Sequence, residues 1–209
     1  MKTKLILAAL IFSMSACAFS ANGEAANSGS ESHTLETFYG LVVNTTANVI
    51  LEQGEKSSIR FEGEARDLKK IETRIENGSL VITGSNQKPL TVYITIGDIS
   101  LIEVNGSARV YSSQVINSDL LLLKVNGSGS IRLDVRSLSL GMIVKGSGKI
   151  YASGSSGSSF TRILGNGKVY AANLDTFYST EEYSNGEEAY RSTKRNSESP
   201  LRPALNLHN

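Results

Sequence analysis

The sequence is poor in the residues on which disulfide-rich domains and many catalytic centres depend. Its 209 residues include one cysteine, two histidines, three prolines and no tryptophan. A single cysteine cannot form an internal disulfide or a cysteine zinc cluster. The formal net charge of +1 excludes the strong positive field of a dedicated nucleic-acid-binding protein. What remains is a chain of one domain's length, 40% hydrophobic and 20% charged, which is enough to form a core.

The N-terminus predicts export. Lys2 and Lys4 precede a short apolar run over 5–12 and then small residues, so residues 1–16 have the pattern of a signal peptide. Cys17 follows Met-Ser-Ala, which fits a permissive bacterial lipobox and predicts lipidation at Cys17. Ordinary signal-peptidase cleavage, at residues 16–18 or 18–20, is the alternative. Residues 17–34, rich in Ala, Ser, Asn and Gly, are expected to be a flexible tether. We expect a periplasmic, outer-membrane or surface location, with membrane contact only through the lipid anchor.

An internal repeat dominates the second half of the chain. Four segments align without gaps, each with a valine or isoleucine two residues before a reference glycine and another four after it: 104–111, 125–132, 144–151 and 163–170. The reference glycines (Gly106, Gly127, Gly146 and Gly165) are 21, 19 and 19 residues apart. A degenerate copy surrounds Gly186, and residues 77–82 keep the same local offsets upstream.

The alternation of apolar and polar residues within each copy indicates strands, and the glycines suit corners because they accept positive φ. Units of about 19–21 residues, without room for crossover helices, predict an all-β, single-domain parallel β-helix over 35–190, followed by a mobile tail over 191–209. Stacked coils would place Val104, Val125, Val144 and Ile163 in one buried column, and Val110, Ile131, Ile150 and Val169 in another. A β-sandwich of hairpins with Asn-Gly turns is the alternative.

Chemistry-bearing motifs are weak throughout. His33 and His208 fall in the expected tether and tail, where no rigid Ser-His-Asp set can form. The Gly-Lys pairs at 148–149 and 167–168 lack the spacing of a phosphate loop. Calcium-binding repeats would need aspartate where the chain has Arg132, Tyr151 and Tyr170. The acids within 104–175, namely Asp119, Asp134 and Asp175, are scattered. We therefore expect no enzyme, no metal and no cofactor.

One outward face is a candidate for binding. Five residues after successive reference glycines come Tyr111, Arg132, Tyr151, Tyr170 and Arg191; three residues after come Arg109, Ser130, Lys149 and Lys168. Both sets should point outward on one sheet. Residues 104–175 carry eight Lys/Arg against three Asp/Glu, a local +5, whereas 31–103 carry seven against eleven, a local −4. Tyrosine faces suit sugar rings and cations suit carboxylated or sulfated glycans. A soluble strand surface with no ligand is the simpler interpretation.

The glycine corners at 105–107, 127–129 and 146–148 and the segments 49–54 and 77–82 carry a resemblance to a known bacterial family. The sequence resembles the putative auto-transporter adhesin, head GIN domain proteins. The resemblance runs from about Phe38 to Lys194 and implies an exported β-helical, adhesin-like domain, without catalytic residues to transfer. We expect a non-enzymatic binding module for polysaccharide or a surface partner. A self-associating structural envelope protein, or more remotely a polysaccharide-active enzyme, is the alternative.

Overall fold

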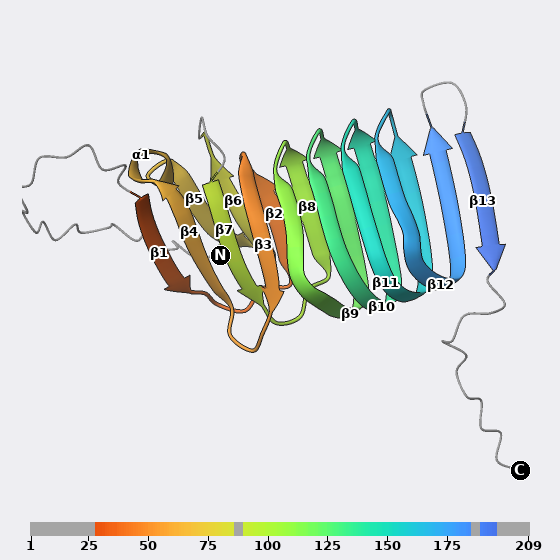
Figure 1. Cartoon of the computed structure of the whole chain (residues 1–209), viewed down its shortest axis with the longest axis horizontal. Helices are drawn as coiled ribbons and strands as arrows, with labels where there is room; N and C mark the ends of the chain where they lie inside the picture. The colour runs from red at the N-terminus through yellow and green to blue at the C-terminus, as the bar shows by residue number, and fades with distance from the viewer. Residues whose placement is uncertain (1–27, 86–89, 185–188, 196–209) are drawn as a thin grey trace, which may run out of the picture.

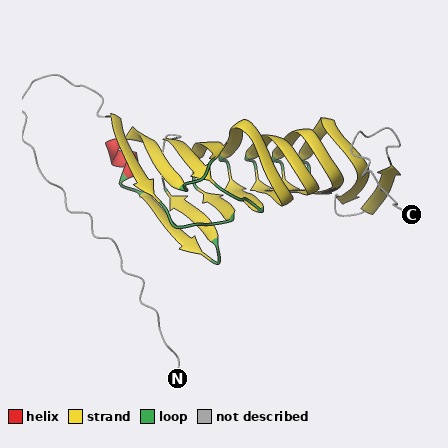
Figure 2. Cartoon of the chain, turned by 90° about the horizontal axis from the view of Figure 1, so that it is seen from below, coloured by secondary structure: helices red, strands yellow, loops and turns green. Residues whose placement is uncertain are grey.

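The glycine-containing units form four long, bent strands stacked in parallel. The computed structural model describes residues 28–85, 90–184 and 189–195. The strands are β9 (Arg109–Gly127), β10 (Ser130–Gly146), β11 (Lys149–Leu164) and β12 (Lys168–Ser184). Each runs down the sheet that faces the viewer in Figure 1, bends at the bottom, and returns up the sheet behind it. We call these the front sheet and the back sheet. The predicted parallel β-helix is thus confirmed, as an elongated β-solenoid (Figure 2).

The two predicted columns form the core between the sheets. Strand pairing places Val104 beside Val125, Val125 beside Val144, and Val144 beside Ile163. The second column is aligned in the same way, from Val110 to Val169. All members of both columns are buried except Val169, which packs against the core half-exposed.

Glycine is required at the upper corners for two reasons. Gly106, Gly127, Gly146 and Gly165 all have φ between +99° and +124°, a region that other L-residues avoid. In addition, a Cβ atom on Gly127 would lie 2.8 Å from the carbonyl oxygen of Gly106 in the neighbouring coil. The corners therefore stack backbone against backbone.

Serine and threonine hydroxyls support the lower bends. Ser156 Oγ donates a hydrogen bond to the Ser158 carbonyl oxygen (2.7 Å) and is 3.0 Å from Ser137 Oγ in the coil before. Thr176 Oγ1 donates to the Tyr178 carbonyl oxygen in the same way (2.9 Å). Ser156 is fully buried. Each hydroxyl satisfies a carbonyl group two residues ahead, which is how small polar side chains stabilise a bend.

The N-terminal half adds two parallel layers whose order differs from the chain order. One layer contains β2 (Gly40–Asn44) and β3 (Ala47–Gln53), the other β6 (Ser79–Gly84) and β7 (Leu90–Ile96). β2 pairs with both β6 and β8 (Leu101–Gly106), and β3 with both β7 and β9. The β2–β3 layer therefore lies between layers that follow it in sequence.

Antiparallel strands close both ends. β4 (Ser58–Glu64) pairs with β7, and β1 (Ser28–Thr34) pairs with β4. After α1 (Ala65–Leu68), β5 (Ile71–Glu76) pairs with β6 through a tight turn in which Asn77 and Gly78 have φ of 50° and 72°. The copy at Asn77 is therefore a hairpin turn, because two successive positive φ values match a type I′ turn.

The C-terminal end reverses in the same way. β13 (Ala189–Arg195) pairs antiparallel with the second half of β12, with Ser184 opposite Ala189. Gly186 itself lies outside the described residues, but the strands on either side of it run in opposite directions. Within the described residues, β12 is not followed by a further parallel coil, and Arg191 lies opposite Glu182 in strand register instead of following Tyr170.

The folded region is longer at both ends than the expected 35–190. Strand β1 occupies 28–34, which we expected to belong to the flexible tether, and β13 extends to Arg195, beyond the expected start of the tail. The signal segment 1–16, Cys17 and residues 196–209 lie outside the described residues, so their roles stay predictions. Within the described part, no helix is long and apolar enough to cross a membrane.

Candidate binding face

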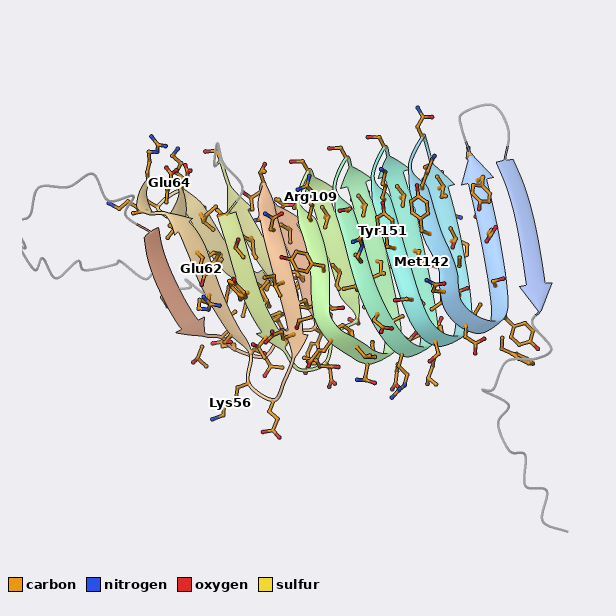
Figure 3. The ribbon with its side chains drawn as sticks, in the orientation of Figure 1. Lys56, Glu62, Glu64, Arg109, Met142 and Tyr151 are labelled. Carbon is orange, nitrogen blue, oxygen red and sulfur yellow. The ribbon has the colours of Figure 1, made fainter. Side chains whose placement is uncertain are left out.

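Strand register brings the predicted face together. On the front sheet, Tyr111 lies opposite Arg132, Arg132 opposite Tyr151, and Tyr151 opposite Tyr170. In the adjacent row, Arg109 lies opposite Ser130, Ser130 opposite Lys149, and Lys149 opposite Lys168. Inward neighbours such as Val110, Ile131 and Ile150 are buried, so both rows point to solvent. Figure 3 labels Arg109 and Tyr151 on this side, and the buried Met142.

The aromatic row continues onto the N-terminal strands, which sequence reasoning missed. Tyr111 lies opposite Ile50 of β3, Ile50 opposite Tyr93 of β7, and Tyr93 opposite Arg60 of β4. The Arg60 guanidinium carbon lies 3.8 Å from the centre of the Tyr93 ring, and Arg60 also pairs with Glu62. A signal was available: residues 40–53 and 101–114 share valine, asparagine, alanine and glutamine at matching positions, 61 residues apart.

The aromatic rings stack on their neighbours along the solenoid axis, so not every tyrosine face is open to a sugar ring as we expected. Tyr151 and Tyr170 stack with ring centres 4.7 Å apart and planes 7° from parallel. On the neighbouring strand, the guanidinium carbon of Arg132 lies 4.5 Å from the centre of the Tyr151 ring. Tyr151 thus has Arg132 and Tyr170 against its ring and cannot stack on a sugar. It offers solvent its edge and hydroxyl group.

The free positive charge is concentrated on β9–β12 of the front sheet. Arg109, Lys149 and Lys168 form no ion pair within the described residues. On the back sheet, by contrast, Lys124 pairs with Glu103 (2.6 Å) and Arg162 with Glu182 (2.8 Å). The cation row ends at β9, because the next positions along it are Asn48, Thr91 and Glu62.

An open hollow of about 600 Å³ lies among the side chains of the two rows. The hollow forms because Ser130, the one small side chain in its row between β9 and β12, separates Arg109 from Lys149. Side chains from both rows line it, namely Arg109, Tyr111, Ser130, Arg132, Lys149 and Tyr151, together with Ser112. Ser128, Gly129 and Val110 complete it.

A second concavity, of about 510 Å³, lies at the lower edge where the chain passes from β7 to β8. Tyr39, Asp98 and Asp119 contribute to it. The Gln53 amide holds this region together: its Nε2 donates to the carbonyl oxygens of Gly97 (2.9 Å) and Asn117 (2.8 Å). Within the described ranges, no group of three or more His, Cys, Asp or Glu side chains could hold a metal ion.

The comparisons with known proteins agree with this architecture. The model of the family described as "Putative auto-transporter adhesin, head GIN domain" matches residues 37–184. The chain belongs to this family. The matched region contains every residue of the two rows, but the family description assigns no role to any of them.

Solved structures share the fold at low sequence identity. A putative adhesin from Bacteroides fragilis NCTC 9343 superposes with a TM-score of 0.69 at 16% identity, covering 76% of this chain and 79% of that one. A putative adhesin from Parabacteroides distasonis ATCC 8503 gives 0.60 at 14%, covering 75% and 78%. A protein from the same organism described as a putative lipid binding protein gives 0.58 at 14%, covering 76% and 80%. A search of curated proteins found no match.

Proposed function

We propose that the protein is an exported, non-enzymatic binding module of the bacterial cell envelope that holds acidic polysaccharide on its front sheet. The observation that carries this proposal is the row Arg109, Ser130, Lys149 and Lys168, whose three cations lack acidic partners within the described residues. On the back sheet, Lys124 and Arg162 are paired with glutamates. Neighbouring strands are about 4.8 Å apart, so unpaired cations on three of four successive strands suit a chain of repeated anionic groups.

The chemistry of the face favours binding over catalysis. Acid–base cleavage of a glycosidic bond needs two carboxyl groups facing one another, whereas the residues lining the hollow are basic, aromatic, small or aliphatic. Membership of an adhesin-like family supports the same proposal. The N-terminal charge pattern and Cys17 support delivery to the envelope as a lipoprotein, and mass spectrometry of the mature N-terminus tests that part.

The test compares two triple variants with the same charge change. In the first, Arg109, Lys149 and Lys168 are replaced by serine; in the second, the exposed cations Lys56, Lys69 and Lys145, which lie away from both rows, are replaced by serine. On an acidic-glycan column at low salt, we expect the first to lose retention and the second to keep it. Equal retention of both would refute the proposal, and equal loss would show that only net charge matters.

A second function, self-association as a structural envelope protein, is favoured by one observation. β13 covers only residues 178–184 of β12, and residues 168–175 pair with β11 on one side alone in the described part of the chain. Such edges accept added strands. Size-exclusion at several concentrations tests this function, which requires a concentration-dependent increase in size.

A further inference from the structure

We propose that the hollow at Ser130 is a subsite for one anionic sugar residue, with its acidic group between Arg109 and Lys149 and its ring against Tyr111. This inference rests on the proposed function and narrows it from a charged face to one position. Ser130 interrupts the row of cations between Arg109 and Lys149. A lysine or arginine at position 130 would fill the space that the serine leaves open.

The position of Arg132 leaves one ring accessible. Its guanidinium carbon lies 4.5 Å from the centre of the Tyr151 ring, and Tyr111 lies opposite Arg132 on the other neighbouring strand. Tyr111 has no ring contact within the described residues and is 38% exposed. Tyr151, in contrast, stacks on Tyr170. Among the aromatic residues that line the hollow, Tyr111 is therefore the one able to pack against a ligand ring.

The polar groups around the hollow define the ligand class. Arg109 and Lys149 come from the strands on either side of Ser130, and Arg132 comes from the same strand two residues later. These cations and the Ser130 hydroxyl can donate hydrogen bonds to a carboxylate or sulfate. An aliphatic sugar ring packs well against a tyrosine ring. A uronic acid or a sulfated sugar satisfies both requirements.

The experiment uses calorimetric titration of the mature protein with four probes. They are a galacturonate trisaccharide, a sulfated galactose trisaccharide, a neutral galactose trisaccharide and a triglutamate peptide. The variants are Ser130→Leu, which fills the hollow without changing charge, and Tyr111→Leu, which removes the ring. Their controls are Ser155→Leu, at an outward serine lower on β11, and Tyr39→Leu, at a 52% exposed tyrosine of the second concavity. Circular dichroism confirms that each variant is folded.

We expect at least one acidic trisaccharide to bind, and the two acidic probes show which acid is preferred. Each hollow variant should weaken that binding by about five- to tenfold, the loss of one charge-assisted hydrogen bond or ring contact, whereas each control should change it less than about twofold. The neutral probe should not bind. Triglutamate should bind at least about tenfold more weakly than the acidic sugar, because it lacks a ring.

The outcomes separate this inference from the broader function. Binding that survives Ser130→Leu but is lost when Arg109, Lys149 and Lys168 become serine would overturn the subsite and leave the charged face intact. Equal binding of triglutamate would show that no ring is recognised, which also overturns the subsite. Absence of binding by the unmodified protein to either acidic sugar would overturn both proposals.

Discussion

Replacing Gly129 by alanine tests whether the coils stack as tightly as their corners require. A Cβ atom there would lie 2.6 Å from Val104 Cγ1 and 2.6 Å from the Ala108 carbonyl oxygen, both in the neighbouring coil. The oxygen cannot retreat freely, since it accepts a hydrogen bond from the Ser130 N–H (2.9 Å). The added methyl group must therefore displace backbone as well as side chain.

The magnitude follows from two opposing effects. Overpacking of this kind costs about 1–3 kcal/mol, while alanine gains about 0.4–1 kcal/mol by restricting the unfolded chain. We expect Gly129→Ala to lower the free energy of unfolding by about 1–2 kcal/mol, measured by urea denaturation. For a chain of this length the melting temperature should fall by about 2–8 °C.

The matched control is Gly97→Ala. A Cβ atom on Gly97 would meet only the Gly54 carbonyl oxygen, at an ordinary 3.7 Å, so this variant should be neutral or slightly more stable. In the double variant Gly129→Ala, Val104→Ala, the removed methyl group relieves one of the two clashes, so the combined loss should be smaller than the sum. Full stability of Gly129→Ala, or strict additivity in the double variant, would refute the close stacking of coils.

Two further predictions concern ladders of hydrogen-bonded side chains that link one coil to the next. Ser156→Ala should lower the free energy of unfolding by about 1–3 kcal/mol, because it removes a fully buried hydroxyl that bonds to Ser137 and Ser158; Ser155→Ala is its control and should stay within about 0.5 kcal/mol. Asn105→Ala should cost about 1–2 kcal/mol in the same assay, because the Asn105 amide donates to Asn44 (2.7 Å) and accepts from Asn126 (2.8 Å). An unchanged denaturation midpoint in either variant would show that its ladder contributes nothing to stability.

The regular half of the solenoid could be predicted because each coil repeats the same requirements. Positive φ at the reference glycines, alternating inward residues and a constant coil length act together, so aligning the repeats also aligned the strands. The predicted register of both rows agrees with the strand pairing from β9 to β12, but not at Arg191. The repeat pattern left the structure around Asn77 and around Gly186 open. Asn77 lies in a hairpin turn, and the described strands before and after Gly186 are antiparallel. An Asn-Gly sequence is compatible with both structures: at Asn77 two successive residues have positive φ, whereas at the corners only the glycine does.

The layer order of the N-terminal half could not be predicted from a fixed period. The β2–β3 layer contacts β8 and β9 at a distance of 61 residues in sequence, because β4, α1, β5, β6 and β7 are inserted between them. A search for repeats about 20 residues apart misses two layers that are 61 residues apart in sequence. Side-chain similarity at the larger offset, including Ala47 with Ala108 and Gln53 with Gln114, was the available signal.

The orientation of the aromatic rings could not be predicted from the sequence either, and it determines which ring faces a ligand can reach. Register determines that Arg132, Tyr151 and Tyr170 are neighbours, but their χ angles depend on how each side chain packs against the next. Once they stack along the axis, the most regular part of the row has the fewest free ring faces. We therefore expect a repeated surface of this kind to bind ligands at its irregularities. On the front sheet that irregularity is Ser130, where the cation row is interrupted and the ring of Tyr111 remains accessible.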